Sequence, residues 1–260
     1  MLLAACVLAL AATTTGSLAA SGSGFDLSSL PSVSAIQCMH NSGYNAMFMR
    51  AYQSLGRPDP NAYQAIQNAH SAGLPYIDVY MFPCPTCGTT PATQFNALIT
   101  NLKPLIYGRV WLDVEEDSSG QYWSTSYGTN QNFYQGLINA CISTGYKCGV
   151  YSNYNNWVRI FGSSTYQATN AAQYPVWYAS WDGQNNYNNY AKFGGWTTPG
   201  LKQHTGDTSM CGLGVDLNWY SNNAALWDHK RAVNGGADVV LAVEEEEDHA
   251  GLKAGAILDN

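Results

Sequence analysis

Charged side chains are scarce in this chain of 260 residues, and the positively charged ones are the scarcest. Lysine and arginine together number 11, against 18 aspartates and glutamates, which gives a formal net charge of −7 at pH 7. No basic stripe follows the sequence that could track a phosphate backbone or an anionic lipid surface. We therefore expect no nucleic-acid partner and no binding to a charged membrane.

Long apolar runs are also missing after the first twenty residues. The opening segment, MLLAACVLALAATTTGSLAA, combines a short apolar stretch with small residues and an A-x-A-like cleavage site at its end. The apolar stretch is too short to cross a bilayer, so we expect no membrane span. The pattern predicts a secretory signal peptide over residues 1–20, and hence a protein that is secreted or delivered to the lumen of a compartment.

Cysteines are few, and their number becomes even once Cys6 leaves with the signal peptide. An even count in a secreted chain predicts disulfides, and proximity in the sequence favours two short-range pairs, which leaves one long-range pair. The predicted pairs are Cys38–Cys211, Cys84–Cys87 and Cys141–Cys148. The alternative for the C-x-x-C segment is a redox motif or half a zinc site, but prolines make it a rigid turn and no second C-x-x-C follows. We expect no metal.

Aromatic residues, in contrast, are abundant, with 18 tyrosines and 8 tryptophans. Aromatic faces stack on pyranose rings, so this composition fits an extracellular protein that handles sugars. A tyrosine-rich core and surface is the alternative, and composition alone does not separate the two.

Apolar runs alternate with helix-like segments along most of the chain. This alternation predicts parallel strands, and eight strands in about 200 residues predict a (β/α)₈-type barrel at its lower size limit. The segments between the last strands are short, so those strands are expected to connect without full helices. The predicted strands are Gly24–Ser28, Ala46–Tyr52, Tyr76–Phe82, Val110–Glu115, Gly149–Ser152, Val176–Trp181, Leu201–Thr205 and Val215–Trp219.

Three of the intervening helices carry clear start and stop signals. Asp59-Pro60 predicts an N-cap and first helical position, with Gly73 as the end. Thr90-Pro91 predicts the start of a second helix. A third is expected near residues 130–144, with Gly145 after it.

The stretch RVWLDVEED places four carboxylates within five positions at the end of a predicted strand. Asp113 and Glu115 are two residues apart and share a face, with about 7 Å between them along the backbone. Ionised carboxylates that point into a barrel are costly unless they are solvated or paired, so they indicate a cleft. Asp26 on the first strand and Asp216 on the last would lie side by side once the barrel closes. Four carboxylates are therefore expected at one mouth, where barrel active sites lie.

Each of the other acidic residues has a structural alternative. The structural alternative is a turn residue for Asp26 and a strand-end cap for Asp216, and a functional role is favoured for both. Asp78 is expected either to line the cleft or to bond a loop. Glu116 and Asp117 are expected to be solvated or to cap a helix, and Asp182 to belong to a loop.

Three motifs in order resemble one known family. GFDLSS, WLDVEE and GVDLNWY are similar to the signatures of glycoside hydrolase family 25, the Chalaropsis-type lysozymes or N-acetylmuramidases, and two further stretches, YGTNQNFYQGLINACISTGYKCGVYSN and PVWYASWDG, resemble its eukaryotic members. The resemblance covers roughly residues 22–221. It implies a modified TIM-type barrel, (β/α)₅β₃, with mostly parallel strands.

The resemblance also implies a function, namely hydrolysis of the β-1,4 bond between N-acetylmuramic acid and N-acetylglucosamine in bacterial peptidoglycan. The family's four acidic positions match Asp26, Asp113, Glu115 and Asp216. Where many members have an aromatic residue after glutamine, this chain has His204. We expect no cofactor and a monomeric enzyme. The residues that we predict to contact the substrate are Asp78, Tyr80, Tyr151, Tyr178, Trp181, Gln203 and Asn218.

Glycoside hydrolysis needs a proton for the leaving oxygen and a partner for the oxocarbenium-like carbon. Glu115 is expected to be the general acid, because a neighbouring carboxylate and partial burial both favour its protonated form. This predicts an acidic pH optimum, suited to a digestive or phagocytic lumen. Asp113 is expected to act as nucleophile or base, or to hold the substrate's N-acetyl group while that group attacks. The i, i+2 spacing favours the second role.

Two other functions remain open at this point. A chitinase would act on a related acetyl sugar, but chitinases often have a longer D-x-x-D-x-D-x-E run. A glycan-binding barrel without activity would be expected to lack at least one of the acids. Release of reducing ends from peptidoglycan but not from chitin separates all three.

Charge divides the chain into a nearly neutral domain, residues 21–222, and an acidic C-terminal tail, residues 223–260, with four consecutive glutamates. The tail does not resemble the family, and its composition predicts a solvated segment. Removing residues 223–260 should therefore change solubility more than turnover. The measurement is kcat/KM of the shortened chain on peptidoglycan. A shortened chain that folds but does not cleave would show that the tail belongs to the enzyme.

Overall fold

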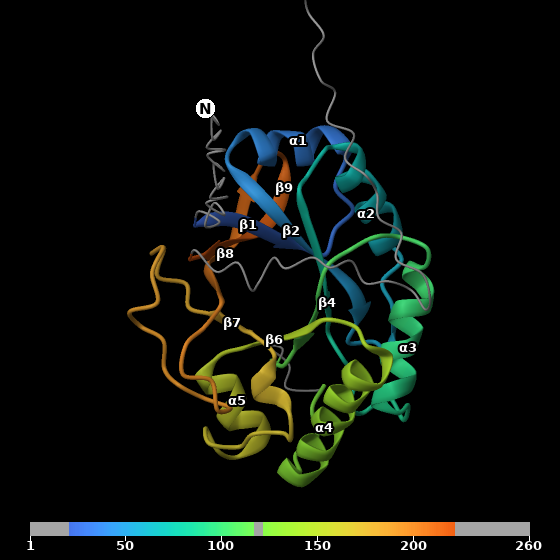
Figure 1. The fold of residues 1–260 in the computed structure, drawn as a ribbon, viewed down its shortest axis with the longest axis vertical. Coiled ribbons are helices and arrows are strands. Elements are labelled where there is room, and N and C mark those ends of the chain that lie inside the picture. Colours follow the sequence, from blue (N-terminus) through green and yellow to red (C-terminus); the bar gives the residue numbers. More distant parts are fainter. Residues whose placement is uncertain (1–20, 117–121, 222–260) are drawn as a thin grey trace, which may run out of the picture.

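The computed structural model describes residues 21–116 and 122–221, which form one closed barrel with helices outside it (Figure 1). The predicted signal peptide, Asp117 and the acidic tail lie outside the described residues. Neighbouring strands pair in the order β1-β9-β8-β7-β6-β5-β4-β2, and β1 pairs with β2 to close the ring, while β3 is an addition to β2. The strands are β1 Gly22–Leu27, β2 Tyr44–Gln53, β3 Arg57–Pro58, β4 Tyr76–Met81, β5 Val110–Asp113, β6 Cys148–Ser152, β7 Val176–Ala179, β8 Leu201–Met210 and β9 Leu213–Tyr220.

Five strand–helix units are followed by three strands that no α-helix separates, which confirms the predicted (β/α)₅β₃ barrel. All strand pairs are parallel from β1 through β2, β4, β5, β6 and β7 to β8. Among the described strands that form the closed ring, β9 alone runs the other way, antiparallel to β8 and to β1, and the added strand β3 is antiparallel to β2. The short β8–β9 turn makes this possible, because a hairpin returns the chain without a crossover helix.

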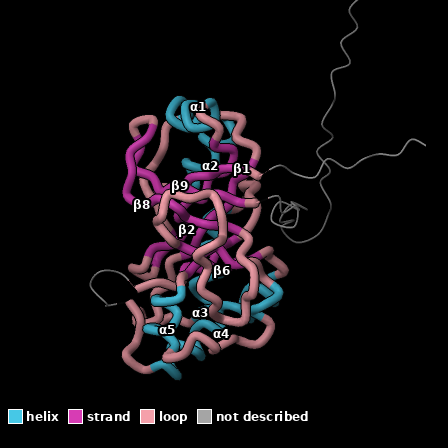
Figure 2. The backbone as a smooth tube through the Cα atoms, turned by 90° about the vertical axis from the view of Figure 1, so that its left-hand side faces the viewer, coloured by secondary structure: helices cyan, strands magenta, loops and turns pink. Residues whose placement is uncertain are grey.

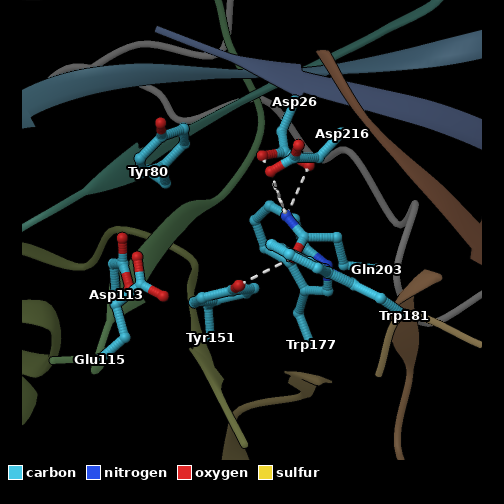
Figure 3. Close-up of a pocket in the computed structure, with 9 residues that line it drawn as sticks. All are labelled: Asp26, Tyr80, Asp113, Glu115, Tyr151, Trp177, Trp181, Gln203 and Asp216. Carbon is cyan, nitrogen blue, oxygen red and sulfur yellow. Dashed lines mark hydrogen bonds between the residues drawn. The ribbon is translucent and has the colours of Figure 1, made fainter. Parts of the chain in front are cut away.

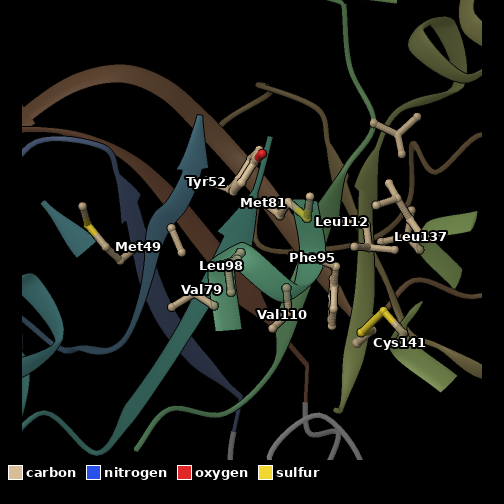
Figure 4. Close-up of a cluster of buried hydrophobic side chains, with 14 of the residues drawn as sticks. Met49, Tyr52, Val79, Met81, Phe95, Leu98, Val110, Leu112, Leu137 and Cys141 are labelled. Carbon is tan, nitrogen blue, oxygen red and sulfur yellow. A yellow bond between two sulfur atoms is a disulfide. The ribbon is translucent and has the colours of Figure 1, made fainter. Parts of the chain in front are cut away.

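The helices cover the outer face of the barrel, and the view in Figure 2 shows the strands between α1 and α2 at one end and α3, α4 and α5 toward the other. Their bounds are α1 Val33–Asn41, α2 Ala62–Ser71, α3 Pro91–Leu102, α4 Tyr127–Thr144 and α5 Tyr154–Phe161. The main core lies between this layer and the strands, where Val110 and Leu112 pack near Phe95, Leu98 and Leu137 (Figure 4). No helix within the described residues is long and apolar enough to cross a membrane.

Helix α3 begins as predicted, with the Thr90 hydroxyl accepting a hydrogen bond from the backbone N–H of Thr93, and α4 ends at Gly145 in the left-handed conformation. Helix α2 begins later than predicted. Asp59 does not cap it, because its carboxylate is buried and accepts bonds from the Arg50 side chain at 2.7 Å and the Asn61 backbone at 3.0 Å.

Other boundaries also differ from the prediction. Helices α1 and α5 were not anticipated, because each is short and its N-cap, Ser32 or Asn153, lacks a following proline. Helix α4 begins at Tyr127 rather than near Asn130, after a Ser126 cap. Strand β8 continues to Met210, since its hairpin with β9 extends beyond the barrel wall.

The three predicted disulfides are present. Cys38–Cys211 joins α1 to the turn between β8 and β9, and Cys141–Cys148 joins α4 to β6. Cys84–Cys87 closes the turn after β4. The long-range bond therefore fastens the last hairpin, which completes the barrel, to the first helix.

Aromatic side chains fill the barrel interior below its mouth. Phe48, Trp111 and Tyr151 surround Trp177, with ring centroids 4.7 to 5.6 Å from it. Gly149 makes this possible, because a Cβ there would lie 2.3 Å from a ring carbon of Trp111. The abundance of aromatic residues is thus partly explained by core packing. These four side chains form a packed floor below the barrel mouth.

Replacing Cys38 and Cys211 together by alanine should destabilise the fold more than the same change at Cys84 and Cys87. The two bonds span 173 and 3 residues of sequence, and chain-entropy cost grows with loop length. That difference predicts losses of about 5 and about 2 kcal/mol in the free energy of unfolding. Denaturant titration of both double variants measures this, and equal losses would contradict the assignment of Cys38–Cys211 as the main covalent brace.

Candidate active site

A pocket opens at the barrel mouth, at the carboxyl ends of the parallel strands (Figure 3). All four of the acidic residues that the motifs singled out line it, and they come from β1, the end of β5 and β9. Aromatic side chains complete the wall. The residues that line the pocket are Asp26, Tyr80, Asp113, Glu115, Tyr151, Trp177, Trp181, Gln203 and Asp216.

Asp113 is the last residue of β5, where strand alternation turns its side chain into the barrel beside Trp111. It is only 3% exposed, and its Oδ1 atom has no hydrogen-bond partner among the described residues. Burial raises the pKa of Asp113 well above its ordinary value, and the charges of Glu115 and Asp26 raise it further, while Arg50 opposes them. An unpartnered buried carboxyl oxygen is costly, so this one is available to a ligand.

Glu115 lies two residues beyond the end of β5 and is half-buried at the pocket wall. Its backbone carbonyl accepts a hydrogen bond from Nε1 of Trp123 at 2.9 Å. This bond fixes the chain as it leaves the strand, and Figure 3 shows the two carboxylates of Asp113 and Glu115 side by side. The predicted pair therefore exists, with Asp113 the more deeply buried partner.

Asp26 and Asp216 face each other across the seam between β1 and β9, as register partners of the antiparallel pair. Burial and the neighbouring Asp216 raise the pKa of Asp26 well above its ordinary value. Burial also raises the pKa of Asp216. Two carboxyls this close favour a state in which one of them keeps a proton.

The side-chain amide of Gln203 connects this pair to the aromatic wall. Its Nε2 donates to Asp26 at 3.0 Å and to Asp216 at 3.1 Å. Its Oε1 accepts from the Tyr151 hydroxyl and from Nε1 of Trp181, each at 2.9 Å. A single buried amide therefore fixes groups from three strands and one loop, as the dashed lines in Figure 3 show in part.

Asn218 supports the same carboxylate from below. Its Nδ2 donates to Asp26 at 2.6 Å, and its Oδ1 accepts from Nε1 of Trp177 at 2.8 Å. Asn218 is fully buried, so it positions Asp26 and does not line the pocket.

The tyrosines of the pocket keep their protons. Burial raises the pKa of Tyr80 and of Tyr151 well above 10, and nearby carboxylates raise both further. Tyr80 therefore presents a neutral hydroxyl that can donate to a sugar oxygen or to one of the carboxylates.

Three predicted substrate contacts are corrected by their location. Asp78 is 1% exposed and accepts bonds from the Arg109 backbone and the Trp111 indole, each at 2.8 Å, so it belongs to the barrel interior. Tyr178 points out of the barrel, where its hydroxyl donates to Asn189 at 2.9 Å. Asn218 is the third, for the reason given above. Each of the three lies on a strand that also carries a pocket residue, but it lies deeper in the barrel or on the opposite face of the strand and so does not line the pocket.

Two residues of the site were missed. Trp177 lines the pocket floor, and strand alternation around it in VWYASW could have indicated an inward side chain. Arg50 is the register neighbour of Tyr80 on β2, so it lies beside the pocket wall. Its bond to the buried Asp59 joins residues nine apart across a loop, which local sequence patterns do not reveal.

Asp113→Asn should stabilise the fold at neutral pH. A carboxyl whose pKa is raised by folding contributes stability below its ordinary pKa of 3.8, and this contribution is lost as the pH rises through the raised value. The amide stays neutral, so Tm at pH 7 should rise by roughly 2–4 °C, the effect of about 1 kcal/mol in a domain of this size. The gain should vanish near pH 4. Glu116→Gln, which replaces a carboxyl group that does not line the pocket, is the control, and a gain independent of pH would contradict the burial argument.

Known proteins resemble this chain in sequence and in fold. A family model described as Lysozyme-like protein 1 matches residues 17–204. Probable GH family 25 lysozyme 2 of Dictyostelium discoideum is 40% identical over 200 residues, which cover 76% of this chain and 90% of that protein. Lysozyme-like protein 5 of Caenorhabditis elegans is 31% identical over 207 residues, with 78% and 93% covered.

Solved structures share the fold at lower identity. A family GH25 lysozyme from Aspergillus fumigatus aligns with a TM-score of 0.62 at 17% identity, over 79% of this chain and 96% of that one. The bacterial lysozyme from Streptomyces coelicolor aligns with a TM-score of 0.64 at 19% identity, over 78% and 94%. The sequence matches carry the assignment and the barrel agrees with it: the chain belongs to glycoside hydrolase family 25, the family of these lysozymes.

Proposed function

We propose that this chain is a lysozyme that hydrolyses the β-1,4 bond between N-acetylmuramic acid and N-acetylglucosamine in bacterial peptidoglycan. The observation that carries the proposal is the gathering of Asp26, Asp113, Glu115 and Asp216 in one pocket of a chain that belongs to this hydrolase family. The pocket combines these carboxyl groups with aromatic side chains and the amide of Gln203, a lining suited to the faces and hydroxyl groups of a sugar.

Glu115 is the proposed general acid. It lies at the wall of the pocket rather than in its floor, so a leaving oxygen can reach it. In the first step its proton moves to the glycosidic oxygen as the bond from that oxygen to the anomeric carbon breaks. The resulting carboxylate then takes a proton from the water that attacks the same carbon.

Asp113 is the proposed partner of the substrate's own 2-acetamido group. The acetamido carbonyl oxygen bonds to the anomeric carbon as the leaving group departs, and positive charge develops on the acetamido nitrogen. The unpartnered Oδ1 of Asp113 is suited to accept the N–H of that group. The buried surroundings that raise the pKa of Asp113 also strengthen its attraction to positive charge, so in its ionised form Asp113 stabilises the charge on the acetamido nitrogen most in the transition state. Water then opens the ring intermediate and restores the acetamido group.

Asp26 and Asp216 are proposed to orient the sugar. Gln203 occupies part of the hydrogen-bonding capacity of both, and the Asp207 backbone N–H donates to Asp216 at 2.7 Å. Each carboxyl oxygen can accept more than one hydrogen bond, and both residues line the pocket. A pair that shares a proton can both donate to and accept from sugar hydroxyls, which fixes the ring without a formal charge of −2.

The place of action is proposed to be outside the cell or in an acidic lumen, where the glycan strand of a bacterial wall is the partner. Three disulfides support this, because such bonds persist in oxidising compartments. We propose that the enzyme acts as a monomer. The experiment that tests the activity is release of new reducing ends from peptidoglycan, with chitin as the comparison substrate.

Glu115→Gln should lower the rate of peptidoglycan hydrolysis by about 10²–10⁴-fold, the usual contribution of a general acid, while glycan binding persists. The matched control is Glu116→Gln, because Glu116 is the adjacent residue and forms only an outer contact with Arg159 at 3.8 Å. Rates on soluble muropeptides and binding of the same fragments measure the two effects. Near-normal hydrolysis by the Glu115→Gln variant would show that Glu115 is not the general acid.

A further inference from the structure

Trp181 is an unusual member of the pocket, because it is 57% exposed although its position is fixed on two sides. Its Nε1 donates to Gln203 at 2.9 Å. One face of its ring lies on the backbone of Gly206, where a Cβ would come within 2.2 Å of two ring carbons. The ring is therefore held by one edge and one face while much of it stays open to solvent, which is the geometry of a platform for a flat apolar surface.

The chain around Trp181 has no regular structure that would hold it. Trp181 is the second residue of the long connection from β7 to β8, residues 180–200, in which only an isolated bridge between Phe193 and Trp196 pairs like a strand. We call residues 180–189 the Trp181 arm. Its backbone touches β8 through Ser180, which donates to the Gln203 carbonyl, and through Gly183, which donates to the His204 carbonyl, each at 2.9 Å.

An ion pair joins this arm to β8, with the lysine buried and the Asp182 side chain 30% exposed. Lys202 is adjacent to Gln203 on β8, so its side chain points to the opposite face, and it is 0% exposed. Its Nζ donates to both oxygens of Asp182, at 2.7 and 2.9 Å, and to the Asn186 carbonyl at 3.1 Å. The ammonium also lies 5.8 Å from the centroid of the Tyr178 ring. Every one of these partners except Tyr178 belongs to the Trp181 arm.

Asp182 also accepts hydrogen bonds from other residues of the Trp181 arm. Its Oδ2 also accepts from Nδ2 of Asn189 at 2.6 Å, and its Oδ1 from the Gln184 backbone at 2.9 Å. The same Asn189 amide group donates to Ser180 at 2.7 Å. Removing a lysine from water costs folding free energy, and two apolar side chains of equal volume at these positions would stabilise the fold at least as well. An apolar pair would not fix the direction of the arm, whereas hydrogen bonds do.

We propose that the Lys202–Asp182 ion pair is a positioning device that holds Trp181 as a stacking platform for an N-acetylated sugar ring, on the side of the pocket away from Glu115. Figure 3 shows Trp181 and Glu115 at opposite sides of the pocket. The identity of the ring as an acetylated sugar of peptidoglycan rests on the proposed function. Gly206 is a required part of the device, because a side chain there would displace the indole.

The location predicts which kinetic constant the pair controls. A ring that stacks on Trp181 lies away from the bond that Glu115 cleaves, so the contact stabilises bound substrate and transition state alike. Loss of the pair should therefore raise KM and leave kcat unchanged. A general loss of structure would instead lower kcat together with Tm.

The experiment replaces both charges at once, with Lys202→Met combined with Asp182→Asn, so that no unpaired charge is left buried. On soluble muropeptides we expect KM to rise about 10-fold, the value of one lost sugar-face contact, with kcat within about 2-fold of the parent. Trp181→Ala should give a similar rise, and adding it to the double variant should raise KM no further. Gly206→Ala leaves the ion pair intact and should also raise KM, while Gly128→Ala, at an open position on α4, should not.

A second measurement does not depend on catalysis. Acrylamide quenching of tryptophan fluorescence, compared with and without Trp181→Phe, reports the accessibility of the Trp181 ring. It should increase in the double variant as the ring leaves Gly206. Unchanged quenching and unchanged KM in a folded double variant would overturn the positioning role, as would effects of the pair and of Trp181 that simply add. If the parent enzyme releases no reducing ends from peptidoglycan, the proposed function fails, whereas quenching still decides the role of the pair.

Discussion

One buried amide, that of Gln203, holds the two halves of the barrel mouth together. Asp26 and Asp216 meet where β1 and β9 pair, and without a donor between them the two carboxylates would repel each other. The same amide accepts hydrogen bonds from Tyr151 and Trp181 on the other side. The positions of Asp26, Asp216, Tyr151 and Trp181 therefore depend on a residue to which we assign no catalytic step.

The reversed strand β9 is the structural condition for this arrangement. Because β9 is antiparallel to both neighbours, Asp216 faces Asp26 in register although the two residues lie at opposite ends of the chain. The Cys38–Cys211 bond fastens the hairpin that carries β9 to α1. Below the site, the aromatic side chains around Trp177 fill the barrel interior, so the carboxyl groups lie above a packed floor and still line an open pocket.

The pocket has two chemically different sides. Asp113 and Glu115 supply a side where carboxyl groups are crowded and poorly solvated, and burial raises the pKa of Asp113 there. Trp177, Trp181 and Tyr151 supply a side of rings and neutral hydroxyls. Crowded carboxyls lower stability and provide reactive groups, whereas fixed rings provide affinity at little electrostatic cost. A glycan strand that crosses the mouth would contact both.

The sequence by itself determined the barrel class, the disulfide pairs and the four acidic residues of the mouth. These features depend on local signals, namely apolar alternation, cysteine spacing and carboxylates at strand ends. Only the tertiary structure decided which polar residues reach the pocket, because Asp78 and Asp113 carry similar local signals, yet Asp78 lies deeper and is bound by Arg109 and Trp111. It also decided the pairing of Arg50 with Asp59 and of Lys202 with Asp182. Ion pairs and depth within a barrel depend on which strands become neighbours and in what register, and no short stretch of sequence contains that information.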